Sequence, residues 1–124
     1  MKYVVLIHAN PQPWGHPTDQ FTAEGRAQPA EYHEEAGASF DALLTEMQER
    51  GEFVHAEALG DPRDARIIGW TPTNHPVSQG PYAETAEHLA GFFVIDVESV
   101  ERAHEIADRF AQPGGTIELR PCAD

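Results

Sequence analysis

The spacing of apolar residues along the chain switches between the pattern of strands and the pattern of helices. Residues 2–9 form a β-branched and aliphatic run without alternation, which predicts a central strand with both faces covered. In residues 31–50, Phe40, Leu43, Leu44 and Met47 stand at i, i+3, i+4 and i+7, the stripe of an amphipathic helix. Gly51 is expected to end this helix, because glycine adopts the left-handed conformation at low cost.

The second half of the chain predicts more strands and one more helix. Residues 52–59 alternate in polarity, which places Phe53, His55 and Glu57 on one face of a strand. Pro81 suits the first position of a helical turn, and Ser99 is expected to cap the second helix. Further strands are expected at residues 65–71, 89–97 and 116–121, with a brief return at 77–78. The buried stripe of the second helix would comprise Val100, Ala103, Ile106, Ala107 and Phe110.

A long connection, in which apolar residues show no clear periodicity, separates the first strand from the first helix. Glycine and proline interrupt residues 14–30, with a short helix expected near Thr22 and with Trp14 and Phe21 as anchors. Connections of this length in compact domains are often binding loops or lids.

This order of elements predicts one domain, residues 1–124, with a ferredoxin-like split βαβ fold of the α+β class and an antiparallel sheet. Both helices would cover one face of the sheet. The other face also carries apolar residues and has no helix left to cover it. We therefore expect a homodimer that packs through this sheet face.

Composition narrows the classes of partner. The net charge of −13 disfavours binding to nucleic acid and to anionic membranes. The single cysteine, Cys122, excludes an intramolecular disulfide and a cysteine-rich zinc site. The first apolar run is too short for a convincing signal peptide, so a cytoplasmic protein is expected.

Four segments follow one another along the chain: MKYVVLIHA, GEFVHAEALGDP, SQGPYAETAEHLAGFFVIDV and GTIELRP. Together they resemble the YCII-related family, in its DGPF-domain branch. The resemblance implies a bacterial-type dimeric α/β barrel with a ferredoxin-like protomer. Gln79 and Tyr82 replace the aspartate and phenylalanine of the name motif. A histidine proposed in the wider family to pair with an aspartate would fall near Phe40, so the resemblance implies no such dyad here.

Several polar side chains are candidates for acid/base chemistry. His55 and Glu57 share a strand face, and a carboxylate beside an imidazole raises its pKa and fixes its tautomer, as a general base requires. Tyr82 is the candidate hydrogen-bond donor, and Gln79 on the same stiff turn is expected to orient a substrate. His8, Trp14 and Phe93 are the remaining candidates for substrate binding.

No cofactor or metal site is expected, and the alternative is a His/Glu metal site assembled from distant strands. The chain lacks HExxH, a phosphate-binding glycine loop and a G-x-S-x-G elbow, and His33 in the sequence His-Glu-Glu is expected to be exposed. We expect a small organic ligand in a pocket at the sheet, with cofactor-free isomerase, lyase or hydrolase chemistry if the protein is an enzyme. The alternative is a non-catalytic dimeric module for ligand sensing or protein interaction.

Overall fold

The computed structural model describes residues 1–83 and 85–123 of the chain. The strands are β1 (Lys2–Ala9), β2 (Phe53–Ala58), β3 (Arg66–Ile68), β4 (Val77–Gln79), β5 (His88–Asp96) and β6 (Gly115–Pro121). The helices are α1 (Ala23–Arg26), α2 (Ala30–Glu49) and α3 (Val100–Asp108), with short 3-10 turns η1 (Thr18–Gln20) and η2 (Pro62–Asp64). None of the described helices combines the length and the apolar character needed to cross a bilayer.

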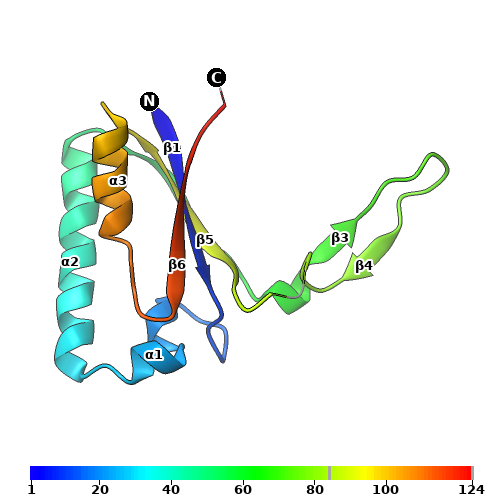
Figure 1. Cartoon of the computed structure of the whole chain (residues 1–124), viewed down its shortest axis with the longest axis horizontal. Helices are drawn as coiled ribbons and strands as arrows, with labels where there is room; N and C mark the ends of the chain where they lie inside the picture. Colours follow the sequence, from blue (N-terminus) through cyan, green and yellow to red (C-terminus); the bar gives the residue numbers. More distant parts are fainter. Residues whose placement is uncertain (84, 124) are drawn as a thin grey trace.

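Four strands form one sheet in the order β2-β5-β1-β6, and every neighbouring pair is antiparallel. Helix α2 connects β1 to β2, and α3 connects β5 to β6. Both helices lie on the same face of the sheet (Figure 1). The expected α+β class, the antiparallel sheet and the single helix-covered face are therefore confirmed.

The helices follow the apolar stripes with two exceptions, Phe40 of α2, which is 40% exposed, and Val100 of α3. Leu43 and Met47 of α2 are buried, and Gly51 ends this helix with a φ of 69°. In α3 the Ser99 hydroxyl accepts a hydrogen bond of 3.1 Å from the Arg102 amide, which confirms the expected cap. Val100 is wrong as a core residue: it is half-exposed, because the first turn of α3 lies at the margin of the core.

A β-bulge in β2 corrects the expected strand faces. The pairing with β5 shifts between Phe53 and His55, so that one extra residue interrupts the alternation. Phe53 therefore packs toward the helices, whereas His55 and Glu57 point to the opposite face. Alternation alone would have placed all three side chains together.

The second face of the sheet carries apolar side chains that no long helix covers (Figure 1). Its centre consists of Val4 and Leu6 of β1, paired with Val94 and Phe92 of β5, and all four are only half-buried. Polar residues of the edge strands β2 and β6 flank this centre, among them His55, Glu57, Glu118 and Arg120. We call this surface the open face.

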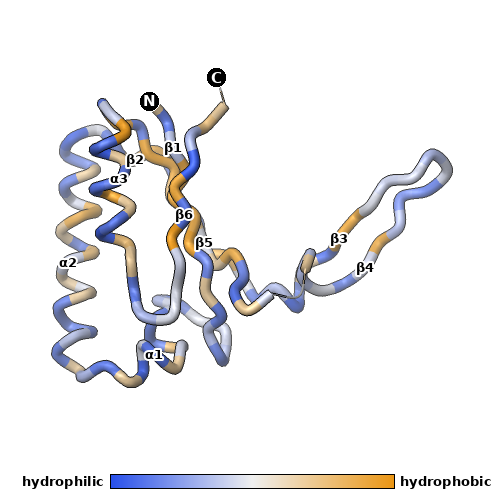
Figure 2. Tube along the Cα trace, viewed as in Figure 1, coloured by the Kyte–Doolittle hydropathy of each residue, from blue (hydrophilic) through white to orange (hydrophobic). Residues whose placement is uncertain are grey.

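Strands β3 and β4 form a separate two-stranded sheet. This hairpin, residues 66–79, stands away from the body on the side of the sheet opposite to α2 and α3 (Figure 1). Apolar residues gather on the sheet strands and again at β3 (Figure 2). The expected strand at 65–71 is thus shorter and lies outside the main sheet. Residues 81–83 and 85–87 do not form the expected helical turn, since so short a helix is marginal without packing.

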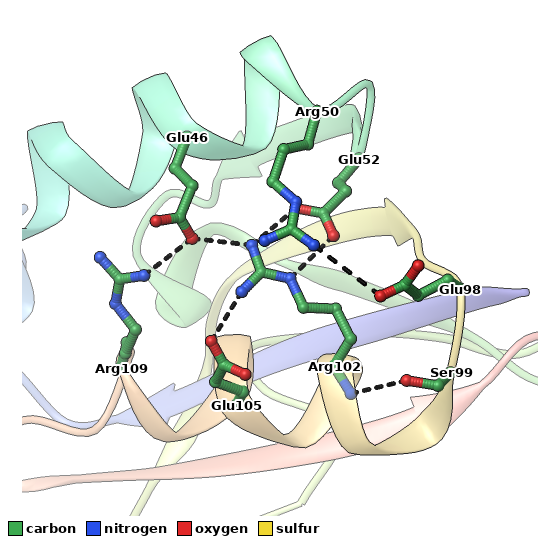
Figure 3. A network of polar contacts seen from close by, with 8 residues as sticks. All are labelled: Glu46, Arg50, Glu52, Glu98, Ser99, Arg102, Glu105 and Arg109. Carbon is green, nitrogen blue, oxygen red and sulfur yellow. Dashed lines mark hydrogen bonds and ion pairs between the residues drawn. The ribbon is translucent and has the colours of Figure 1, made fainter.

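A charged network joins α2, α3 and Glu52, the residue that precedes β2, at one end of the helix layer (Figure 3). The buried Arg102 guanidinium binds both carboxylate oxygens of buried Glu52, at 2.8 and 2.7 Å. It also binds Glu46 at 2.7 Å and Glu105 at 2.8 Å. The hydrogen bonds to Glu52 are the main cause that raises the pKa of Arg102, which keeps this buried cation charged. Each buried charge of this network therefore has a partner.

Candidate functional site

A cavity of about 840 Å³ lies at the other end of the helix layer, between α2 and the sheet. Its floor is built from small residues of β2 and β5, because Ala56, Ala58, Ala90 and Gly91 leave the space under the first half of α2 unfilled. Gly37 and Ala36 of α2 face the same space. A volume of this size lies within the usual range of pockets for small molecules, roughly 300–1,000 Å³.

Three phenylalanine side chains form the apolar wall of this pocket. The ring centroids of Phe93 and Phe110 are 4.7 Å apart, and Phe40 lies edge-on at 6.0 Å from each. These rings come from β5, from the segment after α3 and from α2, respectively. Their arrangement suits an apolar or aromatic ligand body.

Asp19 and His33 form the polar end of the same pocket. Asp19 lies in η1, within the long connection, and His33 lies in the first turns of α2. Both residues line the cavity. The His33 Nδ1 atom lies 3.7 Å from the Asp19 Oδ2 atom, and the two side chains are only 22% and 8% exposed. Nδ1 of His33 is buried and has no hydrogen-bond partner among the described residues.

Gly25 of α1 brings these two residues together. A Cβ atom at position 25 would lie 1.5 Å from the Asp19 carbonyl oxygen, so only glycine allows this backbone approach. The Gly25 carbonyl oxygen also lies 2.9 Å from the His33 Nε2 atom. One glycine therefore positions the backbone of Asp19 and the ring of His33.

This geometry defines the tautomer of neutral His33. A carbonyl oxygen only accepts hydrogen bonds, so Nε2 carries the proton and Nδ1 presents a lone pair. That lone pair faces the Asp19 carboxylate, which is also an acceptor. A proton taken up between the two groups would turn this unsatisfied contact into a charge-assisted pair.

The charge around the pocket is mostly negative. Glu35 and Asp41 line its exposed rim, and Asp19 lies inside. The one arginine of the lining, Arg109, donates a hydrogen bond of 3.0 Å to Glu46 and is thereby paired. Burial, together with the negative charge of Asp19, raises the pKa of Tyr32, which keeps this phenol of the lining protonated as a donor.

The structure distributes the predicted site residues over several surfaces. Phe93 and Glu57 line the pocket, but the Glu57 side chain pairs with His55 at 3.1 Å on the open face. His8 lies on that face as well, 3.1 Å from Glu118. The Trp14 indole donates to the Leu59 carbonyl oxygen at 2.9 Å and anchors the long connection as expected. Gln79 and Tyr82 are exposed at and beyond the end of β4.

The polar residues on which the pocket depends, Asp19, Tyr32 and His33, were not recognised as site residues in the sequence. The expectation that His33 is exposed is wrong, because the ring packs against α1 and η1. Asp19 was not singled out at all. The available signal was the length of the connection at residues 14–30, which indicated a binding loop without naming its residues. A His–Asp pair therefore exists, at positions other than the one inferred from spacing near Phe40.

Within residues 1–83 and 85–123, no group of three or more His, Cys, Asp or Glu side chains is arranged to hold a metal ion. The side chains of the pocket that could exchange a proton with a ligand or donate a hydrogen bond to it include the Asp19 carboxylate, the His33 imidazole and the Tyr32 phenol.

Comparison with known proteins agrees with the motifs found along the sequence. No curated protein matches the chain. The family model of the YCII-related domain matches residues 1–123, which is nearly the whole sequence. The chain therefore belongs to the YCII-related domain family.

Proposed function

We propose that this protein binds a small organic molecule in the pocket between α2 and the sheet, with Asp19 and His33 as a shared proton acceptor. The observation that carries the proposal is the unsatisfied His33 Nδ1 atom, which faces the buried Asp19 carboxylate inside an aromatic cavity. Buried polar groups without partners are rare in proteins and concentrate at functional sites.

The reaction class that fits this pair is proton transfer without a cofactor. Asp19 reaches the cavity, and His33 Nδ1 shares the accepted proton, so that the pair acts as a general base. Tyr32 is the hydrogen-bond donor that would stabilise negative charge developing on the ligand. Isomerisation, elimination and hydrolysis all begin with such a step.

The charge of the lining favours a neutral or cationic ligand with an apolar body. Asp19, Glu35 and Asp41 repel an anion, and Arg109 is already paired with Glu46. We therefore expect selection against carboxylate and phosphate ligands.

Three aromatic probes of similar size test this proposal by thermal shift. Benzylamine and benzyl alcohol should raise the melting temperature, whereas benzoate should not. Gly37→Leu provides the blocked pocket, because an added Cβ at position 37 meets no atom within 4 Å and the side chain would fill the cavity. Shifts that survive in Gly37→Leu would contradict binding at this site.

Proton transfer is tested separately from binding. Carbonyl compounds that shift the wild type are followed by proton NMR in D₂O, and C–H exchange should occur with wild type and disappear with Asp19→Asn. The control is Glu34→Gln, which removes an exposed carboxylate outside the pocket lining. Binding without any exchange would favour the non-catalytic sensing module instead.

The open face supports a further part of the proposal, a homodimer. Its half-buried centre of Val4, Leu6, Phe92 and Val94 would be covered by the same face of a second copy. Two ferredoxin-like protomers of the DGPF branch would then form a dimeric α/β barrel, with the His55–Glu57 pair at its interface. Sedimentation velocity at micromolar concentration should give a dimer, and Leu6→Lys should give a folded monomer. A wild-type monomer would contradict this part and leave the pocket proposal standing.

A further inference from the structure

Within the part of the chain that the structure describes, the hairpin formed by β3 and β4, residues 66–79, is a separate two-stranded sheet that stands away from the body (Figure 1). We call it the arm. Its two strands pair with each other over three residues each, from Arg66 opposite Gln79 to Ile68 opposite Val77. An isolated two-stranded hairpin is at best marginally stable in water. The arm therefore needs a surface to cover it.

Large apolar side chains of the arm point into solvent. Ile68, Trp70 and Val77 are 69%, 73% and 64% exposed. Ile68 and Val77 are directly paired across the strands, so they lie on the same face of the hairpin. Trp70 follows two residues after Ile68, so three large apolar side chains are exposed within 14 positions. Exposed apolar side chains in such number are typical of interaction sites.

The charge of the arm contrasts with the charge of the rest of the chain. Residues 65–83 contain no aspartate or glutamate and include Arg66 and His75, whereas the whole chain has a net charge of −13. The arm thus complements an acidic protein surface, and a single arginine does not make a phosphate-binding patch. A second copy of this chain provides such an acidic surface.

The direction of the arm indicates where this surface lies. The arm leaves the sheet near the start of β5 and projects outward on the side away from α2 and α3, which is the side of the open face (Figure 1). Each side of the 14-residue arm has seven residues, which span about 23 Å when extended. A four-stranded sheet is about 15 Å wide from its first strand to its last. The arm is therefore long enough to reach across the sheet of a neighbouring molecule. A molecule seated on the open face would lie directly beside the arm.

From these observations we infer that the arm clasps a second copy of the chain, burying Ile68, Trp70 and Val77 against its acidic body. The inference rests on the association through the open face proposed above and adds a separate contact to it. By two-fold symmetry, the arm of each copy covers the other. Both the arm and the open face then contribute to the affinity of one copy for the other.

Sedimentation equilibrium of the full chain tests this inference. The variant Ile68→Ser/Trp70→Ser/Val77→Ser should weaken the dimer by about 100-fold or more, because three apolar contacts are lost. Val100→Ser is the control, since Val100 is an exposed valine of α3 on the helix side, and it should leave the dissociation constant unchanged. An unchanged dissociation constant in the arm variant of a dimeric wild type would overturn the arm contact alone, and a wild-type monomer at all concentrations would overturn both proposals.

Fluorescence gives a second readout that does not depend on affinity. The chain has two tryptophans, Trp14 and Trp70, so Trp14→Phe leaves Trp70 as the only indole. Its quenching by acrylamide should be weak at high protein concentration and should increase on dilution or in the Leu6→Lys background. Full quenching at every concentration would show that the arm stays in solvent, which would refute the clasp.

Discussion

The two ends of the helix–sheet layer are built from the same elements and have opposite character. At the end near Arg102, the second half of α2 packs Leu43 and Met47 into the core, and the buried charges are paired. At the other end, the first half of α2 lies over alanine and glycine, and His33 Nδ1 is left without a partner. One end is organised for stability and the other for binding.

This difference shows how a small domain can hold a pocket. The filled end supplies the core contacts that keep α2 and α3 on the sheet, so that the hollow end can persist without collapsing. Substitutions at the two ends should therefore differ in the sign and size of their effect on the free energy of unfolding.

The largest difference is expected for Arg102→Met. This change leaves buried Glu52 with Arg50 alone, at 3.7 Å, and should lower the free energy of unfolding by about 3 kcal/mol. Urea denaturation measures it. Arg109 is more exposed than Arg102 and also binds Glu46. Arg109→Met should therefore lower the free energy of unfolding by less than about 1 kcal/mol. Equal losses in both variants would show that the buried network is not what distinguishes this end.

Truncation of apolar side chains along α2 should give a graded effect. Leu43→Ala creates a cavity in the filled end and should cost about 2–5 kcal/mol. Phe40 is 40% exposed at the pocket, so Phe40→Ala should cost less than half as much in urea denaturation while weakening the binding of benzyl alcohol. If Phe40→Ala lowered the free energy of unfolding as much as Leu43→Ala, the side chains at the pocket end would contribute to stability as much as those of the filled end.

The same chemical change should have opposite signs at the two ends. Glu52→Gln weakens a buried ion pair and should lower the free energy of unfolding by about 2 kcal/mol. Asp19→Asn removes a buried carboxylate that faces the unprotonated His33 Nδ1 atom at 3.7 Å, and should be neutral or stabilising by up to about 1 kcal/mol. A marked destabilisation by Asp19→Asn would indicate a structural role for this carboxylate.

The smallest effect concerns pH. The hydrogen bond from Arg102, aided by the charges of Arg109 and Arg102, lowers the pKa of Glu46 from its ordinary value of 4.5. The stabilisation from a lowered carboxyl pKa is complete above the unfolded value and is lost as the pH falls through the folded value. The melting temperature should therefore fall more steeply below pH 4.5 in wild type than in Arg102→Met. Parallel curves for the two proteins would argue against this coupling.

Much of the fold could be predicted from local pattern. The stripe that contains Leu43 and Met47 located α2, Ser99 located the start of α3, and the apolar run at residues 89–97 located β5. These features depend on residues close together in the chain, where period and capping chemistry act directly. The bulge between Phe53 and His55 could not be predicted, since it depends on how β2 pairs with β5.

The sequence by itself determined the order of helices and strands, the acidic charge and the family motifs, because these are properties of neighbouring residues and of composition. Only the tertiary structure decided that β3 and β4 leave the sheet as an arm, and that Asp19 and His33 meet across Gly25 beneath α2. The physical reason is that a pocket and its polar pair depend on which backbones approach closely, and a single glycine 6 residues after one partner and 8 before the other controls that approach here.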